Sequence, residues 1–183
     1  IVAYDSRRGI GRCGMIPWNL PSDLKYFKAL TTTVDSPGRV NAVIMGRKTW
    51  NSLVDLGRAP LKNRANFVIT SMPISDSRVN SVGSIDEAMK LIDEKEDLFH
   101  RVFGIGGRAV YGPALNDSRC KRIYATEIEG DFKCDVFFPE DPKFREVFIG
   151  DYFEENGIRF RRKEYIGRGD SAGIRFRKRR GIK

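Results

Sequence analysis

Two apolar runs in this chain end at glycine and pass directly into helix-forming sequence, and this pattern constrains the fold more than any other feature. Residues 41–45 (NAVIM) lead through Gly46 into a predicted helix that reaches Leu56. Residues 101–105 lead through Gly106-Gly107 into a second, at residues 108–115. Strands followed at once by helices are typical of α/β sheets that are largely parallel, and ligands then bind beyond the carboxyl ends of the strands.

Other segments extend the same alternation. Residues 21–33 predict a helix that begins at Pro21, and Ser84 with Glu87 forms a capping box before a second amphipathic helix. Further strands are predicted at residues 1–4, 65–70, 122–126, 147–150 and 158–166. Residues 5–19 are rich in glycine and predict a long mobile loop of the kind that often carries function.

Length and charge divide the chain into two unequal parts. Its 183 residues suit one globular domain, and no apolar run approaches the ~20 residues of a membrane span. Residues 167–183 carry seven cations against one carboxylate, a net +6, which leaves only +3 of the total +9 for residues 1–166. We therefore predict a folded domain at 1–166 and a basic, disordered tail at 167–183, which repeats the GIRFR sequence of residues 157–161 at 173–177.

The rare reactive residues limit the chemistry. Cys13, Cys120 and Cys134 are an odd number at unrelated spacings, so we expect neither a disulfide framework nor a metal site, and we expect a reducing compartment. His100 is the only histidine, lies in a charged segment and is predicted to be at the surface, which disfavours histidine-based catalysis. The chain opens at Ile1 without an initiator methionine, which leaves open a segment before it.

Asp23 is the most informative acidic residue. On the predicted helix it shares one face with Phe27 and Leu30, at i, i+4 and i+7, and Trp18 lies nearby in sequence. One interpretation is a solvated acid in the first turn, where the helix dipole favours it. The other is a carboxylate in an apolar pocket, with a raised pKa and a catalytic role.

Basic residues mark two further candidate sites. Arg47 and Lys48 follow Gly46 at a helix N-terminus, where free N–H groups and the dipole bind phosphate. The Gly106-Gly107 junction repeats this arrangement, and two such junctions favour a ligand with several phosphates, although each is also an ordinary helix start. Arg64 is either a solvated side chain or a fork that holds a carboxylate.

These features occur in one order along the chain. The stretches are PWNLPSDLKYF (17–27), VIMGRKTW (43–50), PLKNR (60–64), GGRAVY (106–111) and DVFFP (135–139). The chain resembles the dihydrofolate reductases over residues 1–166, with the Asp-type acid of bacterial forms and the KTW and DVFFPE sequences of animal forms, so we expect an invertebrate eukaryotic enzyme. The resemblance implies a monomeric cytoplasmic oxidoreductase with an antiparallel last strand, which transfers a hydride from NADPH to C6 of 7,8-dihydrofolate with protonation at N5.

The resemblance also implies roles for individual residues. Asp23 binds the pterin and favours protonation at N5, Thr126 braces it, and Trp18 orders a water beside it. The residues implied to line the substrate are Ile1, Ile16, Leu24, Phe27, Leu53, Leu61, Arg64 and Ile105, with Arg64 on the glutamate carboxylate and the Ile1 and Ile105 carbonyls facing the pterin.

The implied cofactor site is larger. Its residues are Ala3, Ile10, Gly11, Gly14, Met15, Gly46, Arg47, Lys48, Thr49, Thr70, Ser71, Met72, Gly106, Gly107, Arg108, Ala109, Val110 and Tyr111. The family carries a cis peptide at the Gly106-Gly107 position. Vertebrate members have Arg where this chain has Ser71, so Arg47 is expected to bear more of the adenosine 2′-phosphate.

Three alternatives remain open. A reductase of another pteridine or a riboflavin-pathway substrate has the same fold, but such a substrate leaves Arg64 with no carboxylate to bind. A basic nucleic-acid-binding module is disfavoured because the charge is terminal and carries one interleaved aromatic, Phe176. The chain could also be one domain of a fusion with thymidylate synthase. Dihydrofolate and antifolates are the expected partners, with no metal or membrane.

Overall fold

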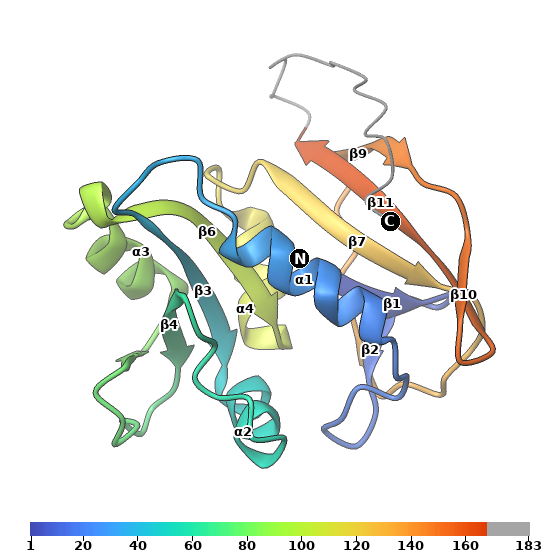
Figure 1. Cartoon of the computed structure of the whole chain (residues 1–183), viewed down its shortest axis with the longest axis horizontal. Coiled ribbons are helices and arrows are strands. Elements are labelled where there is room, and N and C mark those ends of the chain that lie inside the picture. Colours follow the sequence, from blue (N-terminus) through green and yellow to red (C-terminus); the bar gives the residue numbers. More distant parts are fainter. Residues whose placement is uncertain (168–183) are drawn as a thin grey trace.

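The computed structural model describes residues 1–167 and contains two large sheets side by side, with a third sheet of only two short strands (Figure 1). The first has four strands in the order β5-β4-β3-β6, and every pairing in it is parallel. Its strands are β3 (Val40–Gly46), β4 (Arg64–Ile69), β5 (Val79–Val82) and β6 (Phe99–Gly106). Parallel neighbours need crossover connections, and helices at residues 47–55 and 85–93 supply those from β3 to β4 and from β5 to β6. The connection from β4 to β5, residues 70–78, contains no helix.

The second sheet has five strands and is mixed. Its order is β1-β7-β11-β10, with β9 paired to β11, and its strands are β1 (Val2–Asp5), β7 (Arg122–Ile128), β9 (Phe144–Ile149), β10 (Phe153–Glu155) and β11 (Ile158–Gly167). β1 runs parallel to β7, whereas β11 runs antiparallel to β7, β9 and β10. The main-chain nitrogen of Ile1 donates to the carbonyl of Gly104 at 2.9 Å and so joins the two sheets.

Helices cover both faces, as the alternation of buried residues requires. Ala42 and Ile44 of β3 face α3 (Ile85–Asp93) and α4 (Arg108–Asn116). Val43 and Met45 of the same strand face the opposite layer, which contains α1 (Pro21–Thr32) and α2 (Arg47–Asp55). In Figure 1, α1 crosses the front of the molecule and α2 lies below it. The expected α/β class and antiparallel last strand are confirmed: the first sheet is parallel throughout, and the second adds antiparallel strands to the parallel β1–β7 pair.

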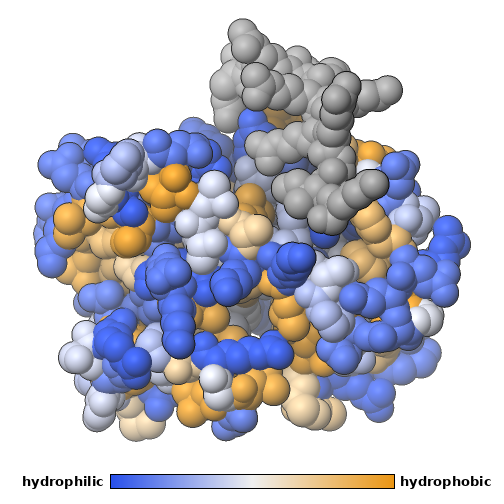
Figure 2. All heavy atoms as spheres, viewed as in Figure 1, coloured by the Kyte–Doolittle hydropathy of each residue, from blue (hydrophilic) through white to orange (hydrophobic). Residues whose placement is uncertain are grey.

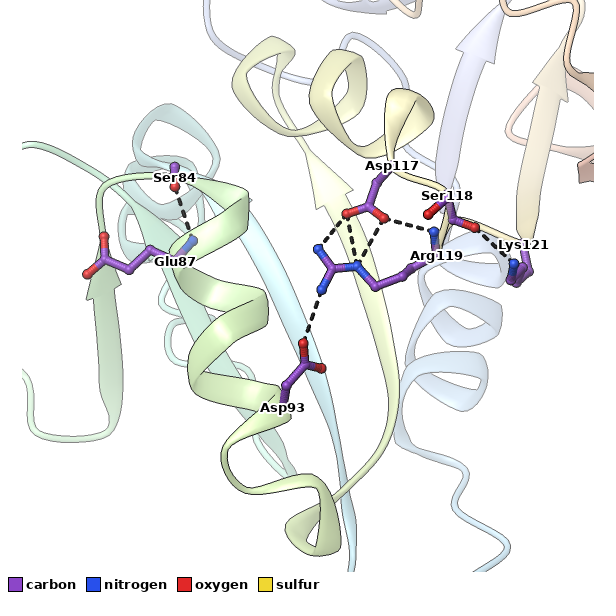
Figure 3. Close-up of polar contacts among 7 residues, drawn as sticks. All are labelled: Ser84, Glu87, Asp93, Asp117, Ser118, Arg119 and Lys121. Atoms are coloured by element: carbon purple, nitrogen blue, oxygen red, sulfur yellow. Dashed lines mark hydrogen bonds and ion pairs between the residues drawn. The ribbon is translucent and has the colours of Figure 1, made fainter.

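Polar contacts fix α3 to the structure around it (Figure 3). The Ser84 hydroxyl accepts from the Glu87 N–H at 3.1 Å, as the capping box predicts, while the Glu87 carboxylate accepts from the Gly83 N–H at 2.7 Å. At the other end of the helix, Arg119 donates to Asp93 at 3.1 Å and to Asp117 at 2.7 Å. The turn after α4 is thereby tied to α3.

The predicted mobile loop at residues 5–19 is more ordered than the glycine content suggests. It contains the short strand β2 (Gly9–Gly11), which pairs with β8 (Val136–Phe137). The buried Asp5 carboxylate accepts from the backbone N–H groups of Gly9 at 2.7 Å and Phe132 at 3.0 Å. A Cβ at Gly9 would lie 2.4 Å from that of Cys134, so only glycine fits this close approach.

The remaining differences concern short elements. The sequence analysis did not identify β2, β5, β8, β10 or the 3₁₀ turn η1 (Glu96–Leu98), all of them four residues or fewer. The prediction for His100 is wrong, because its side chain lies in β6 with 17 % exposure, 3.7 Å from the Asp35 carboxylate. None of the helices described within residues 1–167 combines the length and apolar character needed to cross a bilayer.

Gly167 is the last residue of β11, and its N–H donates to the Lys121 carbonyl at 3.1 Å. The rest of the predicted basic tail and the second GIRFR sequence lie outside the described residues.

Candidate active site

Asp23 lies in the first turn of α1 and points at the second sheet. The Thr126 hydroxyl on β7 donates to the Asp23 Oδ1 atom at 2.5 Å. Thr126 is buried and stands opposite Ala3 in the parallel β1–β7 ladder, so both face α1. The structure thus brings together Asp23 and Thr126, predicted to act as a pair, with Ala3 from the predicted cofactor site.

The surroundings of Asp23 are largely apolar. Trp18 is buried with Leu20, Ile128 and Phe160, and Ala3 packs against the same cluster. Burial raises the pKa of Asp23 above its usual value, and the Thr126 hydrogen bond opposes that rise. Of the two interpretations drawn from the sequence, a carboxylate in an apolar pocket with a perturbed pKa is the one that the structure supports.

An apolar floor extends from Asp23 along α1 and α2. Leu61 belongs to a buried cluster with Val43, Met45 and Trp50. Four other predicted substrate residues pack against that cluster: Ile1, Phe27, Leu53 and Ile105. Ile16 and Leu24 lie at the surface instead, with 61 % and 38 % exposure. Figure 2 shows exposed apolar residues and a hollow in this region below α1, beside α2.

Arg64 lies at the far end of this floor. Its Nη1 group donates to the Thr31 hydroxyl at 2.7 Å, and its guanidinium carbon lies 5.7 Å from the centre of the Phe27 ring. The buried Asn66 side chain bonds the N–H and carbonyl of Leu61 and the carbonyl of Arg64, all at 2.9–3.0 Å. Asn66 therefore shapes the loop that presents Arg64, a role that the sequence analysis missed.

The two strand-to-helix junctions meet. Met45 of β3 stands opposite Gly106 of β6, so α2 and α4 begin side by side. A Cβ at Gly106 would lie 2.8 Å from the Thr49 hydroxyl, and one at Gly46 would lie 3.8 Å from the Ala109 Cβ. The cis peptide implied at Gly106-Gly107 is wrong here, since Ala59–Pro60 is the cis bond found within residues 1–167.

Arg47 forms a second polar cluster at the start of α2. Its Nη1 group donates to the Thr70 hydroxyl at 3.3 Å and to the Met72 carbonyl at 3.0 Å. The start of α2 and residues 70–72, both predicted to bind the adenosine 2′-phosphate, are therefore in contact. Lys48, Ser71 and Arg108 are exposed, and within residues 1–167 their side chains form no hydrogen bond or ion pair with this cluster.

Residues of the loop at 5–19 that were predicted to border the cofactor approach helix α2. The Ser52 hydroxyl of α2 donates to the Gly14 carbonyl at 3.0 Å, which ties the loop tip to the helix. Met15 is exposed, Gly11 lies in β2, and Ile10 packs against the apolar cluster of Val2 and Tyr4.

Two predicted cofactor residues have side chains that are engaged within the protein itself. The Val110 side chain is fully buried in the core with Ala42 and Ile44, so it has no surface to offer a ligand. The Tyr111 hydroxyl donates to the Ile1 carbonyl at 2.9 Å, which joins it to the predicted substrate side. The Ile1 oxygen retains a second lone pair for a ligand.

The structure also adds charged residues near Asp23 that the sequence analysis missed. Arg162 of β11 is the register partner of Thr126, and Glu155 of β10 bonds Ser22 beside Asp23. Alternation along β11 from the buried Phe160 was a signal that could have placed Arg162 on this face.

A cavity of about 420 Å³ lies apart from this candidate active site. Tyr4, Ile123, Phe138 and Tyr165 are among its walls, on the α4 face of the second sheet, and it contains none of the predicted site residues.

Comparisons with known proteins agree with this geometry. The sequence model described as "Dihydrofolate reductase" matches residues 1–165. A dihydrofolate reductase from Aedes albopictus is 39 % identical over 176 residues, with 90 % of this chain and 94 % of that protein covered. The solved structure of Schistosoma mansoni dihydrofolate reductase superimposes with a TM-score of 0.80 at 37 % identity, covering 91 % of this chain and 95 % of that one.

Longer relatives also match. A bifunctional dihydrofolate reductase-thymidylate synthase from Glycine max is 37 % identical over 174 residues, which span 91 % of this chain and 33 % of that protein. Since the family model spans nearly all of the described residues, the match is to the whole fold and includes every segment of the site. The chain belongs to the dihydrofolate reductase family.

Proposed function

We propose that this chain reduces 7,8-dihydrofolate to 5,6,7,8-tetrahydrofolate with NADPH as the hydride donor. The observation that carries the proposal is the Thr126–Asp23 pair at one end of an apolar floor that has Arg64 at its other end. A pterin with an aminobenzoyl-glutamate tail has hydrogen-bond donors, flat apolar rings and a carboxylate in that order. The site offers a carboxylate, apolar side chains and a guanidinium in the same order.

The residues around Asp23 bind the pterin and favour its protonation. The Asp23 carboxylate accepts charge-assisted hydrogen bonds from the pterin's 2-amino group and N3. Its negative charge in an apolar pocket stabilises the proton that N5 gains from water. Thr126 holds the carboxylate in place, and Trp18 orders the water beside it. The Ile1 and Ile105 carbonyls face the pterin edge.

The rest of the substrate lies along the floor. Leu24, Phe27, Leu53 and Leu61 sandwich the rings, and burial of their apolar surface contributes most of the affinity. Arg64 binds the glutamate α-carboxylate through two parallel hydrogen bonds. Its guanidinium is half-buried and oriented by Thr31, so less side-chain freedom is lost when the carboxylate binds.

The residues present fit NADPH. Because Gly106 has no side chain, Thr49 at the start of α2 packs directly against its backbone, which brings the two helix N-termini together where a diphosphate can bind both. The N-termini of α2 and α4 direct N–H groups at the diphosphate, with Thr49 and Lys48 beside it. Arg47, held by Thr70 and Met72, meets the adenosine 2′-phosphate. When bound, NADPH supplies the hydride that C6 accepts.

The alternative substrates are less well matched. A riboflavin-pathway substrate lacks a glutamate tail, so the half-buried Arg64 would lack a carboxylate partner. Location in the cytoplasm and a monomeric state are part of the proposal. The free thiols of Cys13, Cys120 and Cys134 support a reducing compartment. Removal of residues 168–183 is expected to leave turnover within about twofold, since no group of the proposed chemistry lies there.

The test is NADPH consumption by the purified chain, followed by the absorbance of the reduced nicotinamide. Addition of dihydrofolate is expected to start the loss of absorbance, and addition of a riboflavin-pathway aminopyrimidine is not. Turnover of the aminopyrimidine alone would replace the proposed function with the alternative one. If neither substrate starts the loss of absorbance, both the proposed and the alternative function are excluded.

A further inference from the structure

Three consecutive cations of β11 lie in two different environments. Arg161 and Lys163 face the α4 side, where Arg161 pairs with Glu127 at 2.5 Å and Lys163 pairs with Glu127 at 2.8 Å and with Glu146 at 3.3 Å. Arg162 lies between them and therefore points to the opposite face, which is the face of α1 and Asp23.

The position of Arg162 relative to Asp23 follows from two contacts. Arg162 stands directly opposite Thr126 in the antiparallel β7–β11 ladder, and Thr126 bonds Asp23. The guanidinium carbon of Arg162 lies 4.0 Å from the centre of the Tyr26 ring, and Tyr26 is one turn after Asp23 on α1. The strand and the helix thus hold the guanidinium beside the Asp23 carboxylate.

Arg162 is half-buried without a carboxylate of its own. Within residues 1–167 it forms no ion pair, and its buried Nε atom has no hydrogen-bond partner. The guanidinium stacks on the Tyr26 ring, and its carbon also lies 5.3 Å from the centre of the Phe153 ring. These two cation–π contacts offset part of the cost of burying the charge. A cation in such surroundings acts more strongly on a nearby carboxylate than a solvated one.

Glu155 of β10 acts on Asp23 with the opposite sign. Its carboxylate accepts from the Ser22 N–H at 3.0 Å and from the Ser22 hydroxyl at 2.8 Å. It therefore caps α1 from another element, since the helix has no capping side chain of its own at Leu20. This cap places a negative charge one residue from Asp23.

We propose that Arg162 is a positioning residue whose guanidinium, stacked on Tyr26 behind the Thr126–Asp23 pair, stabilises the ionised form of Asp23, while Glu155 destabilises it. Within residues 1–167, the charged groups that act on Asp23 are Glu155 of β10 and Arg162 of β11. Tyr26 of α1 lies one turn away, and Tyr124 of β7 and Glu164 of β11 lie near Tyr26 on the same face of the sheet. The effect on turnover rests on the proposed function, whereas the effect on the Asp23 carboxylate does not.

The directions of the effects on Asp23 are consistent with this arrangement. Burial raises the pKa of Asp23 most, while the Thr126 hydrogen bond and the Arg162 charge lower that pKa and the Glu155 charge raises it. Burial also raises the pKa of Tyr26 to about 12, so Tyr26 stays neutral wherever Asp23 titrates.

The experiment titrates Asp23 directly by the ¹³C shift of its carboxyl carbon, assigned with Asp23→Asn. In Arg162→Gln and Arg162→Met the midpoint is expected to move to higher pH by about half a unit or more, since a nearby opposite charge has been removed. Arg162→Lys retains the charge and is expected to restore most of the wild-type midpoint. Glu155→Gln, which keeps an acceptor for Ser22, is expected to move the midpoint to lower pH.

Arg161→Gln is the matched control, because it removes the same charge from the adjacent position on the other face. It is expected to leave the Asp23 midpoint within about 0.2 units. Thermal unfolding verifies that each variant is folded, and Arg162→Met keeps the apolar stem if Arg162→Gln does not fold. If neither neutral variant folds, a Glu155→Gln midpoint that does not fall overturns the proposal.

Turnover gives the second readout. The pH profile of kcat in Arg162→Gln is expected to move in the same direction as the Asp23 midpoint, with little change in the KM for NADPH. An unchanged Asp23 midpoint in folded Arg162→Gln and Arg162→Met would overturn the proposal, whatever the activity. A wild-type chain that does not reduce dihydrofolate would instead refute the proposed function, and the titration would still decide the role of Arg162.

Discussion

Thr126 of β7 donates a 2.5 Å hydrogen bond to Asp23 of α1, across a separation of 103 residues in sequence. The bond occupies one carboxylate oxygen and fixes the rotamer of the acid, so that the other oxygen is available to a ligand. It also ties the first turn of α1 to the five-stranded sheet. Further along the helix, Phe27 packs on the four-stranded sheet. Helix α1 therefore spans both sheets, and its acid lies where they meet.

Replacement of Asp23 by Asn is expected to keep the fold and to lower turnover by roughly 10²- to 10⁴-fold at neutral pH, the range for a positioned acid–base group. The Asn carbonyl still accepts from Thr126, but the negative charge is lost. Steady-state kinetics from about pH 5 to about pH 9 measure the effect. Asp35→Asn, at an exposed carboxylate, serves as control. Wild-type rates in Asp23→Asn across this range would remove Asp23 from the mechanism.

The same substitution is expected to change stability with pH in a defined direction. Since burial raises the pKa of Asp23, the carboxylate binds a proton more readily in the folded state than in the unfolded state. Ionisation of Asp23 therefore lowers the stability of the fold as the pH rises above the pKa of Asp23 in the unfolded state. Asp23→Asn should therefore be more stable than the wild type at neutral pH, with the difference shrinking as the pH falls towards 3.8, the ordinary value for Asp. Urea midpoints at several pH values measure it, and a constant difference would mean that Asp23 is not desolvated.

Replacement of Arg64 by Leu is expected to weaken folate binding by about 1.5–3 kcal/mol through loss of a charge-assisted fork. A small antifolate without a glutamate tail should bind almost unchanged, because it does not reach Arg64. Equilibrium fluorescence titration of both ligands measures the difference. Arg58→Leu, at a nearby exposed arginine, is the control. Equal losses for the two ligands would show that Arg64 acts on the fold and not on the carboxylate.

Replacement of Arg47 by Ala is expected to raise the KM for NADPH by about tenfold or more, the effect of losing a charge-assisted hydrogen bond. The KM for NADH should change much less, since NADH lacks the 2′-phosphate that Arg47 is proposed to bind. Parallel kinetics with both dinucleotides test this, with Arg145→Ala on the distant strand β9 as the control. A similar rise for both would place Arg47 on the shared diphosphate.

Local pattern was enough to predict the elements that carry the chemistry. Pro21 and the spacing of Asp23 and Phe27 specify α1, and the capping box at Ser84 specifies α3, because these signals lie within a few residues. The glycine junctions at Gly46 and Gly106 likewise identify the two helix starts that the fold brings together.

Long-range contacts were beyond such patterns. The loop at residues 5–19 is ordered because Asp5 accepts from Phe132, 127 residues away, and no local signal reveals that partner. Arg162 appears in the sequence as one of several cations, and only the β7–β11 register separates it from Arg161. Val110 follows a junction predicted to bind phosphate, yet the helix turns its side chain into the core.

The most direct measurement follows the transferred hydrogen itself. The wild-type chain is mixed with dihydrofolate and NADPH carrying deuterium at both positions of nicotinamide C4, and the folate product is analysed by mass spectrometry and NMR. Tetrahydrofolate with a single deuterium at C6 is the expected product, formed at a strongly reduced rate by Asp23→Asn. Unlabelled tetrahydrofolate, a label at another carbon, or unreacted dihydrofolate would contradict hydride transfer from NADPH to C6 at this site.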